Sequence, residues 1–394
     1  MKKLLAAVRR SAARHPWLAR VMRFAGLLLR QWPWIVPAGV IASAARWIDE
    51  VHERGGWYAR QRGDWYKILY PASLRACVPP PSGTAQDRFR DDLFHRIPEA
   101  GVFCFRGACV LSDEGAVLSR DNRLFGEFVH HFRISAIDEG RYFKPFASFS
   151  LDPKRSTEWI ALLAAPECRN YYHWLFDVLP RLHLLAEFRG QIELFAVPAG
   201  LTPVQLETIG LLGVGREALL ELVPDRKIYC ERLLVPSLPG SEGAVPEWAV
   251  KFLRDRFLEG CAVPSKRRKL YLSRAGAGQR QLVNELEIAA LLAERGFETV
   301  KAAQLSFKEQ LALFREAAAV VGCHGAGFAN LVFASDCRVL ELFSPEYFRP
   351  DCFFTLSAQL GHRYQYLVGR ASTTGWGDIS VDRQDLASVL DGWG

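Results

Sequence analysis

The chain of 394 residues is 49% hydrophobic and 24% charged, a composition typical of a globular protein long enough for two domains. Nine cysteines are scattered without a C-x-x-C pair, which argues against a zinc ribbon or a disulfide framework and favours a reducing compartment. The net charge of +7 is local: residues 1–62 hold 12 Lys and Arg against 3 Asp and Glu, and the rest of the chain holds 38 against 40. The body of the protein therefore offers no basic surface for nucleic acid.

Residues 1–48 contain the pattern of a basic amphipathic helix. From Trp17 onward, apolar side chains share one side of a helical wheel, and Arg20, Arg23 and Arg30 fall on the other. Helices of this kind lie in a membrane interface with Trp at the headgroup level. The arginines interrupt the apolar run, so neither a membrane-spanning helix nor a signal peptide is expected. The alternative is a helix that covers the folded domains, or an arm that binds a partner.

Residues 96–240 are expected to form a first domain, preceded by a Pro-rich linker at 77–92. Turns at 106–107 and 112–115 divide its first apolar runs into a small β-meander. A helix follows, and Thr202 with Pro203 begins a second helix as a cap with Pro at the first helical position. The expected strands of this half are 102–105, 108–111, 116–118, 159–163, 193–197 and 232–235.

Residues 241–394 show a regular alternation of strands and helices after a Gly-, Ser- and Pro-rich boundary at 236–246. Capping-box patterns begin two of the helices, at Asn284 and at Ser306. The order β-α-β-α-β-α-β predicts a parallel doubly wound sheet, in which ligands bind beyond the carboxyl ends of the strands. The expected strands are 269–273, 298–300, 318–321 and 339–342.

A glycine-rich turn at 322–327 joins one of these strands to the next helix. Backbone N–H groups in such a turn can approach an anionic ligand closely, which favours phosphate and hence a nucleotide or nucleotide-sugar. The alternative is a turn that serves only packing. Arg274 and Arg280 flank a second flexible loop at a strand end, and their two guanidinium groups could neutralise a diphosphate.

Three polar residues near this turn are further candidates. His324 could donate a hydrogen bond to a phosphate or ribose oxygen, Asn330 could cap a backbone group or hold the turn, and Glu341 could accept from ribose hydroxyls. If Glu341 is buried, it should be paired, because an isolated buried carboxylate is costly.

A second set of candidates lies on the helix expected at 170–182, where His173, Asp177 and Arg181 are spaced four residues apart and share a face. Either His173 or Asp177 could be the general base for a hydroxyl nucleophile. The alternative is a salt bridge between Asp177 and Arg181 beside an aromatic core around Trp174. Two ligands alone do not make a metal site, and no D-x-D motif is present in an apolar context, so no metal is expected.

The ordered motifs of the chain resemble those of glycosyltransferase family 61, which includes many bacterial capsular polysaccharide biosynthesis proteins. The resemblance covers roughly residues 100–345 and rests on segments in the family's order. These are Asn170-Tyr171-Tyr172-His173-Trp174-Leu175-Phe176-Asp177-Val178-Leu179-Pro180-Arg181-Leu182, Leu270-Tyr271-Leu272-Ser273-Arg274 with Arg280 and Asn284-Glu285, Glu309-Gln310, Gly322-Cys323-His324-Gly325-Ala326-Gly327-Phe328-Ala329-Asn330, and Leu340-Glu341-Leu342.

The resemblance implies a GT-B architecture, with two Rossmann-like domains facing a cleft and the donor nucleotide in the C-terminal one. It also implies inverting sugar transfer with no obligatory metal or cofactor. The family often has a paired Arg-Arg where this chain has Gln279-Arg280. By position, His173 and Asp177 would be catalytic. The donor would contact Arg274, Arg280, His324, Gly325, Ala326, Gly327, Asn330 and Glu341, and the acceptor side would hold Asn170, Tyr172, Trp174 and Arg181.

These observations predict an α/β protein with a basic helical extension and linker (1–95), an acceptor-side domain (96–240) and a nucleotide-sugar-binding domain (241–394). The expected function is transfer of a sugar from a nucleotide-sugar, a UDP-sugar above all, to a hydroxyl of a surface polysaccharide or lipid-linked glycan. The expected location is the cytoplasmic face of a bacterial plasma membrane, reached through residues 1–48. A polysaccharide pyruvyl transferase and a non-catalytic scaffold of a polysaccharide assembly complex are the alternatives.

Overall fold

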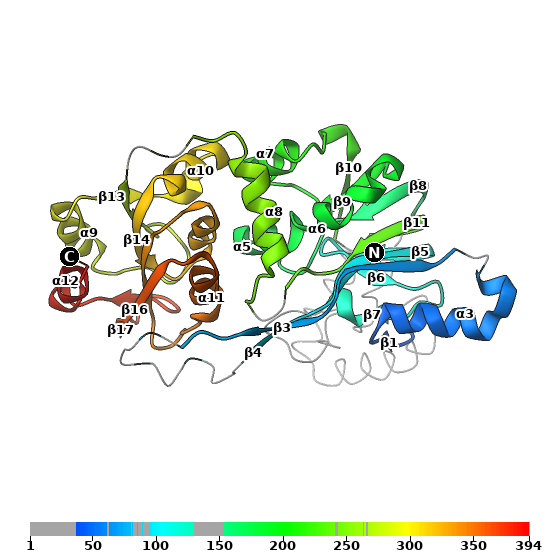
Figure 1. Cartoon of the computed structure of the whole chain (residues 1–394), viewed down its shortest axis with the longest axis horizontal. Helices are drawn as coiled ribbons and strands as arrows, with labels where there is room; N and C mark the ends of the chain where they lie inside the picture. The colour runs from blue at the N-terminus through cyan, green and yellow to red at the C-terminus, as the bar shows by residue number, and fades with distance from the viewer. Residues whose placement is uncertain are drawn as a thin grey trace, which may run out of the picture.

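The computed structural model describes residues 37–60, 63–79, 94–129, 153–224, 226–240, 243–262 and 267–393, together with Pro81, Ala85, Phe89 and Pro264. The protein is a mixed α/β structure built on a nine-stranded sheet and a five-stranded sheet that lie side by side along its longest axis (Figure 1). No helix in these ranges is long and apolar enough to cross a membrane. None of the nine cysteines, all within these ranges, forms a disulfide.

The nine-stranded sheet is mixed, with the order β1-β7-β6-β5-β11-β8-β9-β10 and with β2 paired to β5. The strands β11, β8, β9 and β10 run parallel, as in a Rossmann-like sheet, whereas β5 pairs antiparallel with β11, β6 and β2. Its strands are β1 (Val40–Ile41), β2 (Trp65–Tyr70), β5 (Ala100–Leu111), β6 (Ala116–Leu118), β7 (Leu124–Phe125), β8 (Lys154–Leu162), β9 (Leu194–Pro198), β10 (Leu219–Leu222) and β11 (Lys227–Pro236).

The turn expected at 106–107 is wrong, because β5 runs without a break from Ala100 to Leu111. Arg106 and Gly107 are exposed, and Gly107 has a φ of +71°, yet the pairing with β11 keeps one register on both sides of them. Pairing along the whole length of β11 therefore outweighs the local turn signal of Arg-Gly. The turn expected at 112–115 is confirmed between β5 and β6.

The first sheet already begins within residues 37–70. The strands β1 and β2 belong to it, and helix α3 (Ala44–Arg60) packs Trp47 and Ile48 into its core. The Trp47 ring lies 5.3 Å from the ring of Phe125. The amphipathic helix expected around Trp17 lies outside the described residues, whereas Trp47 is an interior side chain of this half.

The second sheet confirms the expected parallel alternation. Its order is β13-β12-β14-β15-β16, and all four pairings are parallel. The strand order reverses between β12 and β14, and ligands of open α/β sheets bind beyond the carboxyl ends at such a reversal. The strands are β12 (Arg268–Leu272), β13 (Phe297–Val300), β14 (Ala317–Cys323), β15 (Arg338–Phe343) and β16 (Arg363–Val368).

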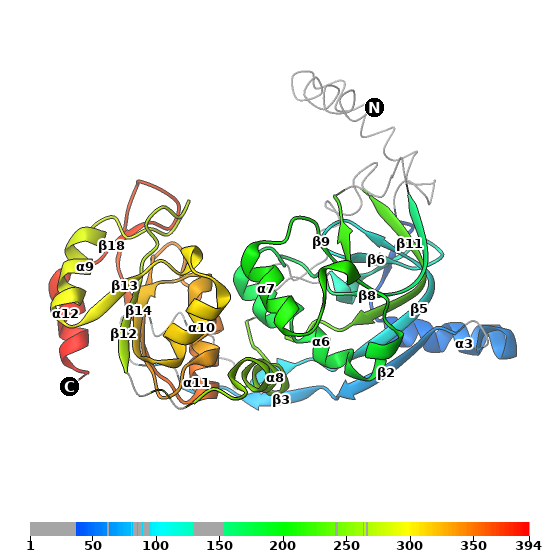
Figure 2. The ribbon, with the colours of Figure 1, turned by 90° about the horizontal axis from the view of Figure 1, so that it is seen from above.

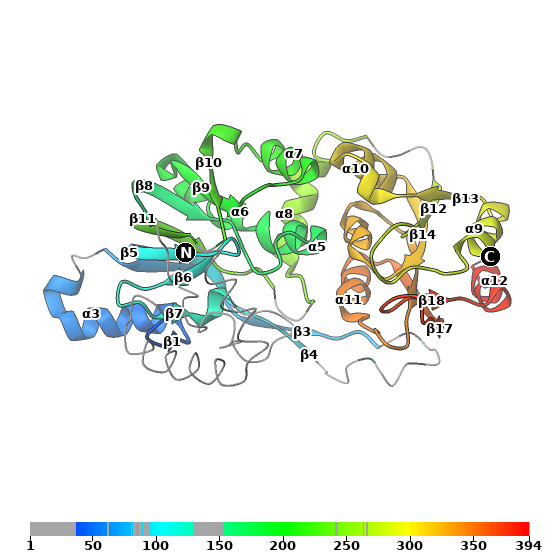
Figure 3. The same ribbon diagram turned by 180° about the vertical axis from the view of Figure 1, so that it is seen from behind.

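Helices cover both faces of this second sheet. The outer face packs on α9 (Glu285–Glu294) and α12 (Arg383–Asp391), and the inner face packs on α10 (Phe307–Arg315), α11 (Asp351–Leu360) and the 3₁₀ helix η7 (Ala326–Phe333) (Figure 3). Ser306 and Glu309 form the predicted capping box of α10. Asn284 precedes α9 without capping it, because its side chain bonds the backbone of Val381 and the carboxylate of Glu287.

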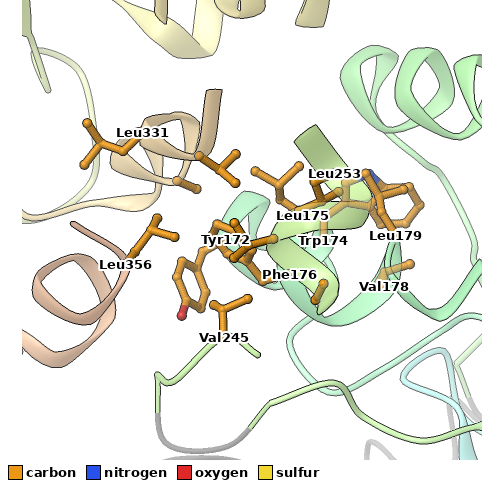
Figure 4. Packing of buried hydrophobic residues seen from close by; sticks show 14 of the residues in the cluster. Tyr172, Trp174, Leu175, Phe176, Val178, Leu179, Val245, Leu253, Leu331 and Leu356 are labelled. Atoms are coloured by element: carbon orange, nitrogen blue, oxygen red, sulfur yellow. The ribbon is translucent and has the colours of Figure 1, made fainter. Parts of the chain in front are cut away.

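The two sheets share one hydrophobic core. Helix α8 (Glu247–Leu258) lies between them in the three ribbon views, as in Figure 2. Arg75 of β3 (Ser73–Ala76) donates to the Val245 carbonyl just before this helix at 3.1 Å. Figure 4 shows Tyr172 on the side of Leu331 of η7 and Leu356 of α11, whereas Trp174, Val178 and Leu179 lie on the opposite side of the segment. The segment that carries the first set of candidate residues is therefore held directly against the second half of the chain.

Candidate active site

The first candidate pair lies in an irregular helical segment. Asn170 caps it by accepting a hydrogen bond from the Tyr172 N–H at 2.9 Å. A short α-helix, α5 (Tyr171–His173), is followed by the π-helical turn η3 (Trp174–Val178), with the i→i+5 hydrogen bond from Leu179 N–H to the Trp174 carbonyl. Single π-helical turns of this kind are often found at functional sites.

His173 and Asp177 form the expected hydrogen-bonded pair. The Nδ1 atom of His173 lies 2.6 Å from Oδ2 of Asp177, so the imidazole donates to the carboxylate. The side chains retain 10% and 24% of their exposure, respectively. A carboxylate that fixes the tautomer of a partly exposed imidazole is an arrangement suited to accepting a proton from a substrate hydroxyl.

Arg181 does not join this pair, contrary to the expectation from its spacing. The π-helical turn adds a residue to one helical turn and so rotates Arg181 away from the face of Asp177. Its guanidinium is buried and donates to the backbone carbonyls of Pro236 at 2.6 Å and Ala164 at 2.7 Å. Burial lowers its pKa to about 9. Arg181 therefore ties the carboxyl ends of β8 and β11 together and does not face an acceptor.

The other residues assigned to the acceptor side are also structural. Trp174 is fully buried and donates from Nε1 to the Thr208 hydroxyl at 2.9 Å. Tyr172 is buried, and its hydroxyl donates to the Gly243 carbonyl at 3.2 Å. Asn170 remains exposed, and its role in the fold is the cap. Trp174 is thus turned into the first half, and Tyr172 is turned toward Phe353 of the second half.

A second pair of histidine and carboxylate lies in the other half. The Nδ1 atom of His324 lies 2.5 Å from Oε1 of Glu341, and the Tyr364 hydroxyl donates to Oε2 at 2.6 Å. Glu341 has no exposed side-chain surface, and both of its oxygens are engaged. The role expected for Glu341, a contact to ribose, is therefore wrong in this geometry, and Glu341 positions His324 instead.

Arg274 and Gly325 meet where the strand order of the second sheet reverses. Arg274 follows β12, and Gly325 follows β14. A Cβ atom on Gly325 would lie 2.0 Å from Nη1 of Arg274, so any other residue here would displace the guanidinium from this position. Arg274 also donates to the carbonyls of Gln279 and Arg280, and burial lowers its pKa. This places a partly buried guanidinium beside the glycine turn, a suitable geometry for an anion.

The other glycines of the turn differ in whether a side chain could replace them. Ala326 and Gly327 begin η7, and a Cβ atom on Gly327 would make only ordinary contacts, the nearest at 3.8 Å. A Cβ atom on Gly322 would come within 2.9 Å of the Leu272 carbonyl oxygen, so this glycine allows the close pairing of β14 with β12. Within the turn, Gly325 is the glycine that admits Arg274.

Asn330 is fully buried and joins the two halves. Its Oδ1 accepts from the Tyr171 hydroxyl at 2.7 Å, and its Nδ2 donates to Gln310 at 2.8 Å. Glu207 of helix α7 (Pro203–Leu211) makes a second link, because its carboxylate accepts from the Phe307 N–H at the start of α10. Asn330 was expected to contact the donor, but its polar atoms are engaged within the protein. Sequence reasoning missed Tyr171 as its partner.

A row of aromatic contacts connects the two histidine pairs. The Tyr172 ring lies 5.3 Å from the His173 ring and 5.7 Å from the Phe353 ring, and Phe353 lies 5.5 Å from His324. The two pairs, far apart in the sequence, are thus brought to the two ends of one short aromatic row across the junction. Tyr172 and Phe353 are buried spacers whose positions no local sequence pattern indicated.

These features define a two-part α/β protein with a His–Asp pair in the first half and with Arg274 and His324 beside a glycine turn of the second half. Residues 171–340 match the family Glycosyltransferase 61, so the resemblance seen in the sequence is confirmed over this region. A stretch of 93 residues is 49% identical to "Beta-1,2-xylosyltransferase RCN11" of Oryza sativa subsp. japonica. It covers 23% of this chain and 17% of the rice protein. The family match encloses the His173–Asp177 pair, Arg274 and His324.

Proposed function

We propose that the chain is a glycosyltransferase that moves a sugar from a nucleotide-sugar to a hydroxyl of a glycan, with inversion at the anomeric carbon. The observation that carries this proposal is the short row of ring contacts, through Tyr172 and Phe353, that joins the His173–Asp177 pair to His324. Arg274 lies beside the same glycine turn as His324. One side offers a proton acceptor, and the other offers cationic and polar groups at the reversal point of a parallel sheet. The match of residues 171–340 to glycosyltransferase 61 supports it.

In the proposed step, the acceptor hydroxyl oxygen attacks the anomeric carbon while its proton passes to the His173–Asp177 pair. The bond between that carbon and the phosphate oxygen breaks, and its electron pair leaves with the nucleoside diphosphate. Arg274 and Arg280 stabilise the negative charge that develops on the departing diphosphate. A single displacement inverts the anomeric centre, and a product of retained configuration would contradict this mechanism.

The donor is proposed to be a UDP-sugar bound to the second half, in a GT-B arrangement that needs no metal. The rice relative is called a xylosyltransferase, so UDP-xylose belongs in the first substrate panel beside UDP-hexoses. The rice protein is from a plant and carries no argument for the bacterial setting. The acceptor, a surface polysaccharide or lipid-linked glycan at the inner face of a bacterial plasma membrane, is a proposal from the sequence alone.

The membrane part of the proposal needs a deletion that respects the fold. Because Trp47 and Ile48 pack in the core of the first sheet, a deletion should stop before residue 37. If residues 1–36 attach the enzyme to a membrane surface, this deletion should release it from vesicles that contain anionic lipid and leave its folding unchanged. Binding that survives the deletion would contradict the attachment.

The first test of the function is thermal unfolding of the full chain with UDP, GDP, CMP or TDP, each with magnesium and with EDTA. A ligand that binds only the native state raises the free energy of unfolding by about 2.7 kcal/mol at one hundred times its Kd. The proposal predicts a shift for one nucleotide in both conditions, lost in Arg274→Ala and kept in the exposed control Arg383→Ala. No shift for any nucleotide would favour a scaffold or a pyruvyl transferase.

A further inference from the structure

A surface loop at residues 372–378 carries a side chain that the site described above does not use. Trp376 is 51% exposed, a large apolar surface for a loop residue. An exposed indole leaves a large apolar face free to pack on a ligand, and aromatic rings of this kind are common at binding sites.

The loop is tied to the loop that carries Arg274 and Arg280. The Arg280 N–H donates to the Trp376 carbonyl at 3.1 Å, and the Gln281 N–H donates to the Asp378 carboxylate at 2.8 Å. The other carboxylate oxygen of Asp378 accepts from the Thr374 hydroxyl at 3.0 Å, and Asp378 is buried. The indole is thus presented on a loop fixed by its own hydrogen bonds.

The Trp376 indole also lies close to residues that are proposed to bind the diphosphate. The Trp376 ring lies 4.9 Å from the Tyr347 ring. The Tyr347 ring in turn lies 5.1 Å from the Arg280 guanidinium carbon and 5.5 Å from the His324 ring. Gly377 has a φ of +71°, and a Cβ atom on it would lie 2.9 Å from Cγ of Arg280, so glycine permits the close approach of the two loops.

The order of these ring contacts indicates how a donor would be oriented in the site. From His173 the contacts run through Tyr172 and Phe353 to His324, and from His324 through Tyr347 to Trp376. A donor whose diphosphate lies beside His324 must turn its sugar toward the His173–Asp177 pair. The nucleoside at the other end of the diphosphate then lies on the side of Trp376.

We propose that Trp376 stacks on the nucleobase of the donor and is a main source of affinity for the nucleoside. This inference rests on the proposed function, because it takes the diphosphate to lie at Arg274, Arg280 and His324. Every nucleobase has a flat aromatic face, and stacking on an aromatic side chain contributes about 1–3 kcal/mol per base. Removal of the indole should therefore weaken nucleoside diphosphate binding about ten- to one-hundred-fold.

The test compares ligands with and without a base. Isothermal titration of the full chain with UDP, GDP and inorganic pyrophosphate is carried out on the wild type, Trp376→Ala and Trp376→Phe. Trp393→Ala serves as the control, because Trp393 packs on Phe297 in another part of the second half. We expect Trp376→Ala to weaken binding of the preferred nucleoside diphosphate and to leave pyrophosphate binding unchanged. Trp376→Phe should restore most of the affinity, and Trp393→Ala should bind as the wild type does.

Each other outcome has one meaning. If the wild type binds a nucleoside diphosphate and Trp376→Ala binds it equally well, the stacking role is wrong and the proposed function stands. An equal loss for pyrophosphate would mean that Trp376 supports the loop and does not stack on the base. If the wild type binds none of the three ligands, the stacking role on a UDP or GDP donor fails, and the thermal panel with CMP and TDP decides the proposed function. Quenching of tryptophan fluorescence by UDP, present in the wild type and lost in Trp376→Phe, would be independent support.

Discussion

The two histidine–carboxylate pairs of this protein have nearly the same internal geometry but different surroundings. In both, the Nδ1 atom of the imidazole faces a carboxylate oxygen, at 2.6 Å in His173–Asp177 and at 2.5 Å in His324–Glu341. The imidazoles are equally exposed, at 10%, but the carboxylates differ: Asp177 retains 24% of its exposure and Glu341 retains none.

The difference in exposure of the two carboxylates suits them to two different roles. A carboxylate open to solvent can take part in a proton transfer, because the proton can leave again between turnovers. A sealed carboxylate that accepts from a second donor, here the Tyr364 hydroxyl, can only orient its histidine. Under the proposed function, proton transfer therefore belongs to the pair in the first half, and the pair in the second half orients the ligand.

The largest effect that would test this comparison is expected from removing the charge of the partly exposed Asp177 carboxylate. Asp177→Asn should lower kcat about 10²- to 10⁴-fold, because general base catalysis contributes effects of that size. The thermal shift caused by a nucleoside diphosphate should not change. Asp255→Asn is the matched control, an exposed acid on α8 paired with Lys251. A full kcat in Asp177→Asn would remove the pair from catalysis.

A third carboxylate shows what burial does without a histidine partner. Burial raises the pKa of Glu127 to about 7, although the Ala44 N–H donates to it, and Glu99 adds to the rise. The pKa of Glu127 is higher in the folded protein than in the unfolded chain, so protonation of Glu127 stabilises the fold. This stabilisation is fully present below about pH 4.5 and is lost as the pH rises through about 7. The wild type should lose up to about 3 kcal/mol of unfolding free energy over this range.

Glu127→Gln should remove this part of the pH dependence, as measured by urea unfolding at pH 4.5 and pH 7.5. The exposed Glu294→Gln should retain the wild-type profile. Identical pH profiles for the wild type and Glu127→Gln would show that Glu127 is ionised at little cost in the folded protein.

The link between the halves sets how the two pairs face each other. Asn330→Ala leaves the buried Tyr171 hydroxyl and the Gln310 amide without their partner, which should cost about 2 kcal/mol of stability. Urea unfolding measures this loss, and Gln384→Ala on the surface of α12 should change stability by less than about 0.5 kcal/mol. A loss no larger than that of the control would mean that the apolar core alone fixes the two halves.

The smallest expected effect concerns the buried carboxylate of the His324–Glu341 pair. In Glu341→Gln, the hydrogen bonds to His324 and Tyr364 can be remade while the negative charge is lost, so nucleoside diphosphate binding should weaken only roughly tenfold. The KM for the donor should rise, and kcat should change little. Glu298→Gln on the edge strand β13 of the same sheet is the control. A fall in kcat as large as that of Asp177→Asn would give both pairs the same role.

Patterns that depend on near neighbours in the chain were readable from the sequence. The cap at Thr202, the capping box at Ser306 and the parallel alternation of the second half follow from short-range hydrogen bonding and hydrophobic periodicity. The same holds for His173 and Asp177, four residues apart. The local sequence also indicated the glycine turn and Arg274, whose guanidinium approaches Gly325.

The tertiary structure decided which of these side chains face inward. Trp174, Arg181 and Asn330 have the residue types of a binding site, yet all three are buried. Trp174 and Arg181 bond groups of the first half, and Asn330 of η7 bonds Tyr171 across the junction. The π-helical turn that rotates Arg181 and the strand pairing that straightens β5 are chosen by distant partners. Burial of a side chain and pairing of a strand depend on residues that are distant in the sequence. Local sequence patterns therefore do not predict them.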